Sequence, residues 1–159
     1  DLVSPAGYAE GFHSAPNMSR IADSSTTELR ELIGLTEARA ETLRTVARAL
    51  VNGLDLRAGA DRELARTELA ALRGIGPWSV ELIAMRALGD PDAYPAGDLI
   101  LRRALETRTD RETIAAAETW RPYRGYATQH LWADFLAGQA ARQAKPVKPV
   151  KPTTKGEPE

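Results

Sequence analysis

The chain has 159 residues, 43% of them hydrophobic, a formal net charge of −1 and no cysteine. This length suits a single domain with a sizeable buried core, and the near-neutral charge gives no support to a general polyanion binder. Without cysteine there is no disulfide framework, thiolate zinc site or cysteine-held iron–sulfur cluster. No stretch is apolar enough to span a membrane and the start, DLVSPAGYAEGF, lacks a signal-peptide pattern, so we expect a cytoplasmic protein.

The N-terminal half predicts an irregular start followed by helices. Residues 1–25 are rich in Ser, Pro, Gly and Asn without a sustained period, whereas the pattern of residues 26–138 predicts a helical domain. Thr36 is a plausible N-cap, and apolar residues with helical spacing follow it until Gly53. Asp61 is the expected N-cap of a second helix, which ends at the sequence RGIGP.

More helices are expected after this break. Pro77 suits the first turn of a helix, where its missing N–H costs nothing. The loop GDPDAYPAG contains two prolines and two glycines, so no helix crosses it. Further helices begin near Asp98, near Asp110 and after Pro122, and the last one ends near Gly138. No segment alternates with period two for long enough to form a strand, so the predicted fold is all-α, with six or seven helices.

Residues 139–159 form a Lys/Pro-rich tail that contains all four lysines of the chain. Its prolines favour extended, polyproline-like conformations and its charge keeps it solvated. We expect this tail to be disordered.

The stretch LRGIGPW joins two predicted helices through a tight turn. Gly74 and Gly76 flank Ile75, which can tuck under the turn, and the missing side chains let the backbone approach another surface closely. The N–H groups that open the next helix then form a ready site for a phosphate oxygen. Taken alone, the turn is explained equally well as a purely structural connection.

Asp98 lies in YPAGDLILRR, between a Pro–Gly loop and an apolar run with two arginines. It can be a helix N-cap, because aspartate is favoured there, or the charged group of a pocket. The two roles are compatible, since the dipole of the following helix also favours an ionised carboxylate.

Together, the hairpin, Asp98 and the segment WRPYRGYATQHLW resemble the helix–hairpin–helix (HhH-GPD) DNA glycosylases, in particular the 3-methyladenine-DNA glycosylase II branch. The resemblance covers about residues 27–138. It implies base excision repair: hydrolysis of the N-glycosidic bond of alkylated purines, such as 3-methyladenine, in double-stranded DNA. It also implies a monomeric, nucleoid-associated enzyme that requires no cofactor.

The resemblance assigns roles to individual side chains. Asp98 would be the catalytic carboxylate that stabilises the oxocarbenium-like sugar and orients the attacking water. Trp132, Trp78 and Tyr126 would form the base pocket, where electron-rich rings can hold a cationic base; core packing is the alternative for the tryptophans and is expected for Trp120. Trp78 stands where strand-cutting members carry the Schiff-base lysine, so we expect a monofunctional hydrolase without lyase activity.

The resemblance also implies contacts to the DNA backbone. They would come from Gly74, Ile75, Gly76, Trp78 and Arg124. For Arg124 an ion pair within the protein is the alternative. Backbone carbonyls of Ala70, Leu72 and Ile75 would hold a monovalent cation. His130 is expected in the core, and Asp90 and Asp92 are expected to be ordinary loop residues.

One family segment has no counterpart in the sequence. The family usually carries an upstream helix, with a Q-x-x-S-V-like stretch, whose wedge residue fills the gap left by the flipped base. We therefore expect a chain truncated at its N-terminus, one with an altered N-terminus, or a degraded paralogue. The leading interpretation is an alkylbase-DNA glycosylase, and the alternative is a non-catalytic helix–hairpin–helix DNA-binding module.

Overall fold

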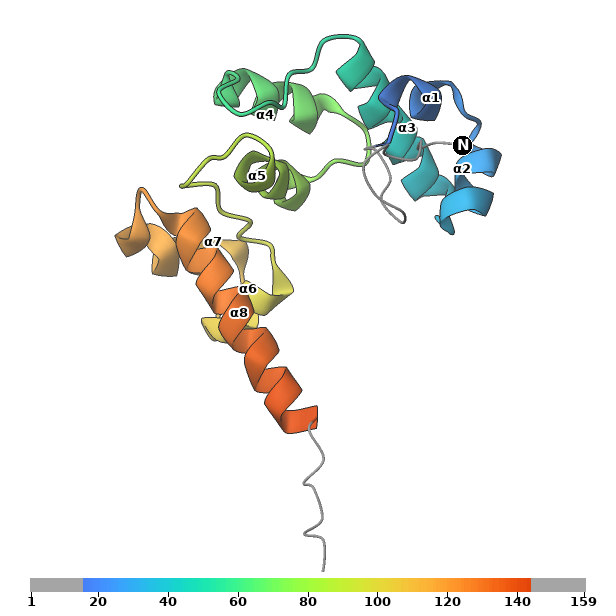
Figure 1. Ribbon diagram of the computed structural model, residues 1–159. Coiled ribbons are helices and arrows are strands. Elements are labelled where there is room, and N and C mark those ends of the chain that lie inside the picture. Colours follow the sequence, from blue (N-terminus) through green and yellow to red (C-terminus); the bar gives the residue numbers. More distant parts are fainter. Residues whose placement is uncertain (1–15, 144–159) are drawn as a thin grey trace, which may run out of the picture.

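The computed structural model describes residues 16–143, and over that range the protein contains helices and no strands (Figure 1). The elements are α1 (Met18–Asp23), α2 (Thr26–Ile33), α3 (Glu37–Val51), α4 (Arg62–Ala71), α5 (Pro77–Arg86), α6 (Leu99–Ala104), α7 (Asp110–Ala117), the 3-10 turn η1 (Glu118–Trp120) and α8 (Arg124–Gln143). The all-α prediction is confirmed. Among these described helices, none is long and apolar enough to cross a membrane. The Lys/Pro sequence after residue 143 lies outside the described residues.

Local capping chemistry explains where the central helices begin. The Thr36 hydroxyl accepts a hydrogen bond from the third residue of α3, at 3.4 Å. Asp61 Oδ1 accepts two backbone N–H groups of α4, both at 3.0 Å. Pro77 is the first residue of α5. These three predicted helix starts are confirmed, because each depends on side chains next to one another in the sequence.

Two predicted boundaries are wrong. The segment 1–25, expected to be irregular, contains α1, which Asn17 caps and whose Ile21 and Ala22 are buried against α3. So short a helix shows no period in the sequence, and its stability comes from this tertiary packing. At the other end α8 continues past Gly138, because the residues that follow it, QAARQ, are good helix formers.

The helices form two groups joined by one loop (Figure 1). Helices α1–α5 lie on one side and α6–α8 on the other, and residues 87–98, here called the connecting loop, run between them. Among the described residues, the buried cluster of α4 and α5 ends with Ala93, and the buried cluster of α6–α8 begins with Tyr94. Within residues 16–143 the helices of one group make only sparse contacts with those of the other, so the connecting loop supplies most of the junction between them.

Candidate active site at the junction of the two helix groups

Asp98 is the N-cap of α6, and its carboxylate also accepts hydrogen bonds from two tryptophans. Oδ1 accepts the backbone N–H groups of Ile100 at 2.9 Å and of Leu101 at 3.0 Å. The indole Nε1–H of Trp132 donates to the same oxygen at 3.0 Å, and that of Trp78 donates to Oδ2 at 3.1 Å. The predicted cap is confirmed, and four donors fix the orientation of a half-buried carboxylate.

The two indoles reach Asp98 from different helix groups. Trp78 is the second residue of α5, directly after the hairpin, and is 41% exposed. Trp132 lies on α8, where its ring packs against the cluster of α6–α8 and the Arg86 guanidinium lies 5.9 Å from its centroid. Trp132 thus combines core packing with a bond to Asp98. Trp120 belongs to the same cluster, as predicted.

The hairpin has the features expected of a turn that faces a partner through its backbone. Ile75 packs against another buried cluster, formed by Leu54, Leu69 and Val80, and its N–H donates to the Leu72 carbonyl at 3.1 Å. Gly74 has a φ of +92°, and a Cβ there would collide with the Thr42 side chain. Gly76 has a φ of −95°, and a Cβ added to it would meet no atom within 4 Å. No side chain caps α5, so the N–H groups at its start are free to bind an anion.

Two aromatic or imidazole side chains of α8 lie away from Asp98. Tyr126 is 61% exposed, stacks in a tilted pair with Tyr123 at 6.2 Å and lines a separate cavity of about 330 Å³. Tyr126 and Trp132 are six residues apart, which places them about 120° apart around a helix. The spacing in the sequence therefore already predicts that the two side chains lie on different faces of α8. His130 is exposed, and the expectation of a core histidine is wrong because the buried positions of α8, residues 125 and 128, lie on another face.

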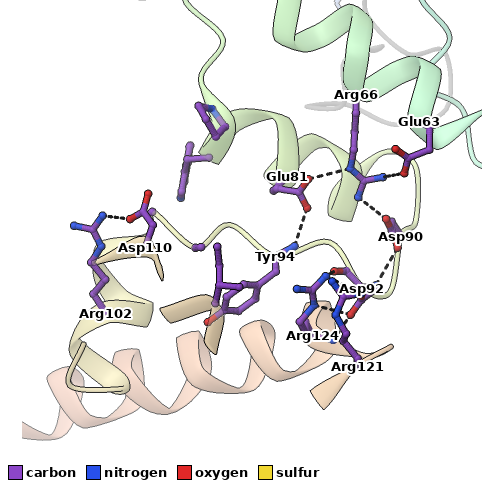
Figure 2. Close-up of a pocket in the computed structure, with 15 residues that line it drawn as sticks. Glu63, Arg66, Glu81, Asp90, Asp92, Tyr94, Arg102, Asp110, Arg121 and Arg124 are labelled. Atoms are coloured by element: carbon purple, nitrogen blue, oxygen red, sulfur yellow. Dashed lines mark hydrogen bonds and ion pairs between the residues drawn. The ribbon is translucent and has the colours of Figure 1, made fainter. Parts of the chain in front are cut away.

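A first set of ion pairs fastens the connecting loop to α4 and α5 (Figure 2). Arg66 of α4 donates to Glu81 Oε1 at 2.9 Å and to Asp90 Oδ2 at 2.5 Å, while Glu81 Oε2 accepts the Tyr94 backbone N–H at 2.9 Å. Burial is the largest single influence on the pKa of Asp90 and acts to raise it. The hydrogen bonds from Arg66 and from the Asp92 N–H, with the positive charges of Arg66 and Arg62, together outweigh burial, and the pKa lies below its usual range. Asp90 is therefore part of an ion-pair network and not an ordinary loop residue.

A second set fastens the same loop to the start of α8 (Figure 2). Arg124 grips Asp92 with two parallel bonds, Nε to Oδ1 at 2.8 Å and Nη2 to Oδ2 at 2.7 Å, and Arg121 adds a third at 3.0 Å. The hydrogen bond from Arg124 lowers the pKa of Asp92. The Arg124 guanidinium also lies 5.8 Å from the Tyr94 ring, whose pKa burial raises to about 12.

These contacts decide between the two interpretations of Arg124. The Arg124 side chain is only 12% exposed, and both arms of its guanidinium bind Asp92. The structure therefore favours the ion pair within the protein over the contact to a DNA phosphate. Asp92, expected to be an ordinary loop residue, is the centre of this pair. The sequence signal was the presence of two carboxylates in GDPDAYPAG and two arginines in WRPYRG.

A cavity of about 830 Å³ opens between the two helix groups, and Asp98 itself is not among the residues that line it. Trp78, which donates to Asp98, and Gly97, which precedes it, line the cavity together with residues of the two ion-pair sets. The ion pair of Arg102 with Asp110 adds to its wall (Figure 2). Of the three predicted aromatic residues, Trp78 alone is among the residues that line this cavity, so its walls are more charged than an aromatic base pocket.

The described residues hold no group of three His, Cys, Asp or Glu side chains suited to a metal ion. The expected cation ligands are instead the backbone carbonyls of Ala70, Leu72 and Ile75. The Leu72 carbonyl accepts the Ile75 N–H and keeps one lone pair, so this oxygen can also bind a monovalent cation.

No protein-family model matches the chain, but several named proteins are similar to it. It is 43% identical over 126 residues to a probable bifunctional transcriptional activator/DNA repair enzyme AlkA of Mycobacterium tuberculosis, which covers 76% of this chain and 24% of the relative. It is 30% identical over 118 residues to DNA-3-methyladenine glycosylase 2 of Escherichia coli, covering 74% of this chain and 42% of the relative. The chain thus spans less than half the length of these relatives.

Two solved structures share the fold at 24% sequence identity. The 3-methyladenine DNA-glycosylase from Archaeoglobus fulgidus superposes with a TM-score of 0.70 over 84% of this chain and 48% of its own. The 3-methyladenine DNA glycosylase Mag1 of Schizosaccharomyces pombe, solved in complex with abasic DNA, gives 0.62 over 84% of this chain and 66% of its own. With the hairpin, the aspartate beyond it and these similarities in sequence and fold, the chain belongs to the helix–hairpin–helix DNA glycosylase superfamily.

Proposed function

We propose that the chain carries the catalytic site of a monofunctional DNA glycosylase that hydrolyses the N-glycosidic bond of alkylated purines in double-stranded DNA. The observation that carries this proposal is the second oxygen of Asp98. A helix cap needs only Oδ1, which accepts both backbone N–H groups of α6. Oδ2 takes no part in the cap and accepts one hydrogen bond, from the partly exposed indole of Trp78.

The chemistry needs one carboxylate. Alkylation at N3 or N7 makes a purine cationic, so the C1′–N bond breaks with its electron pair going to the base, which leaves as a neutral molecule without a strong acid. Asp98 faces the positive charge that develops on the sugar. Oδ2 retains a lone pair that can accept a proton from the attacking water, whose oxygen then bonds to C1′.

The hairpin would hold the DNA while this reaction occurs. The free N–H groups at the start of α5 and the positive end of its dipole suit a phosphate oxygen, and Gly76 leaves room for close approach. A monovalent cation on the carbonyls of Ala70, Leu72 and Ile75 would add positive charge at the same phosphate. Trp78 and Trp132 would contact the base, whereas Tyr126, which lies away from Asp98, would not.

Strand cleavage is not part of the proposed activity. A glycosylase that also cuts the strand attacks C1′ with an amine, and the sequence contains no lysine before residue 145. The indole of Trp78, directly after the hairpin, cannot form a Schiff base. The expected product is therefore an intact strand with an abasic site.

Incubation of the protein with methylated duplex DNA tests the proposal. We expect free methylated purine in the supernatant and a strand that breaks only after added alkali. Strand cleavage without alkali, or a borohydride-trapped protein–DNA adduct, would show that the enzyme is not monofunctional. Tight binding to abasic-site DNA without any base release would instead support the alternative, a non-catalytic DNA-binding module.

A further inference from the structure

We propose that Arg124 and Asp92 are positioning residues for Asp98: their ion pair holds α8 and the connecting loop in the register that aims the carboxylate. This role rests on the proposed function of Asp98. At the junction of the two helix groups, the described helices α1–α5 make only sparse contacts with α6–α8. Helix–helix packing therefore contributes little to the position of one group relative to the other, and the polar contacts of the connecting loop help to set it.

The loop is attached to α8 at one place, through side chain and backbone together. Arg124 binds the Asp92 carboxylate with both arms of its fork and the Asp92 carbonyl with Nη2 at 3.1 Å. The next residue, Gly125, donates its N–H to the Pro91 carbonyl at 2.8 Å. A Cβ on Gly125 would lie 2.8 Å from that carbonyl oxygen, so the two backbones touch and no side chain fits between them.

The same loop is attached to α4 and α5 only a few residues away. Asp90 binds Arg66, and the Tyr94 N–H binds Glu81, so these contacts alternate with those to α8 along residues 90–94. Asp98 is likewise bonded from both helix groups, because Trp78 lies on α5 and Trp132 lies on α8. A shift of α8 against the loop would move one indole relative to the other and turn the carboxylate.

The Arg124–Asp92 pair has the geometry for this task. Its two parallel bonds fix orientation as well as distance, which a lysine ammonium cannot do. The side chains of Arg124 and Asp92 are 12% and 19% exposed, so solvent screens the pair only weakly. A matched pair exists elsewhere: Arg57 grips Asp55 with bonds of 2.9 and 2.7 Å, but its side chain is 87% exposed and lies apart from Asp98.

The test compares Arg124→Lys with Arg57→Lys in the complete chain. Three quantities are measured: the single-turnover rate of base release, the Kd for abasic-site DNA, and the NMR signals of the indole Nε1–H groups. For Arg124→Lys we expect release to fall roughly 10- to 100-fold, because a misplaced catalytic group costs this much, while the Kd changes less than about threefold. The signals of Trp78 and Trp132 should shift. Arg57→Lys should change none of the three.

Unmoved Trp78 and Trp132 signals in folded Arg124→Lys protein, or release at the wild-type rate, would overturn the proposal. Should Arg124→Lys fail to fold, Arg121→Gln removes the more exposed bond to the same carboxylate, together with the Arg121–Glu118 ion pair. It should produce a smaller shift of the same indole signals, and unchanged signals there overturn the proposal equally. If the wild-type protein releases no base but Arg124→Lys still shifts the indole signals, the proposed glycosylase function is refuted. The positioning of the Asp98 carboxylate by the ion pair then still stands.

Discussion

Replacing Asp98 with asparagine separates the helix cap from the negative charge. The amide oxygen can take the place of Oδ1 and keep the bonds from Ile100, Leu101 and Trp132. The amide nitrogen then stands where Oδ2 accepted the Trp78 indole N–H, so two donors face each other. The substitution thus removes one hydrogen bond and one charge and preserves the start of α6.

The two losses differ in size. Aspartate and asparagine are nearly equal as N-caps, so the cap contributes little to the change. A hydrogen bond to a charged group contributes about 1.5–3 kcal/mol when both partners are buried, and the 41% exposure of Trp78 lets its N–H turn to water. We therefore expect a loss of about 1 kcal/mol in the free energy of unfolding, or roughly 3–5 °C in Tm. Loss of the transition-state charge should lower base release by about 10²- to 10³-fold.

Calorimetry and single-turnover release of methylated purine, measured on the same preparations, check both magnitudes. Asp61→Asn is the matched control, because Asp61 caps α4 with two backbone bonds to Oδ1. It should change neither the release rate nor Tm appreciably. Binding of Asp98→Asn to abasic-site DNA should persist. If Asp98→Asn releases base within a fewfold of the wild-type rate, Asp98 is only a cap and the proposed mechanism is wrong.

Further substitutions and a pH titration test other parts of the structure. Gly76→Ala should weaken binding to all DNA sequences alike, with little change in Tm, since a Cβ meets no atom of the protein; undiminished affinity in a filter-binding assay would show that the hairpin is only a connector. Gly74→Ala, at a φ of +92°, should instead lower thermal stability by about 1–3 kcal/mol. Gly125→Ala should also be destabilising, and a Tm equal to wild type would contradict the backbone contact described for it. Arg124 lowers the pKa of Asp92 below its unfolded value of 3.8. The stability that this pair contributes is therefore complete above pH 3.8 and is lost as the pH falls through the lower pKa of the folded state. Asp92→Asn should make the fall of Tm less steep when Tm is measured from about pH 5 downward.

The sequence by itself determined the helix starts that depend on neighbouring residues. Thr36, Asp61 and Asp98 each bond to backbone N–H groups two or three residues further on, so the sequence already contains both partners. The hairpin is equally local, because its tight turn needs the left-handed conformation that Gly74 supplies. Helix α1 shows the limit of this reasoning, since its six residues are stabilised by burial against α3.

Only the tertiary structure decided how the candidate site is assembled. Asp98 as a cap follows from α6 alone, but its bonds to Trp78 and Trp132 join residues 20 and 34 positions away. Likewise, nothing next to Arg124 in the sequence distinguishes a phosphate contact from an ion pair with Asp92, 32 positions away. The reason is physical: a cap is satisfied within one helical turn, whereas the partner of a long side chain depends on which distant backbone lies within its reach and on how much water remains there.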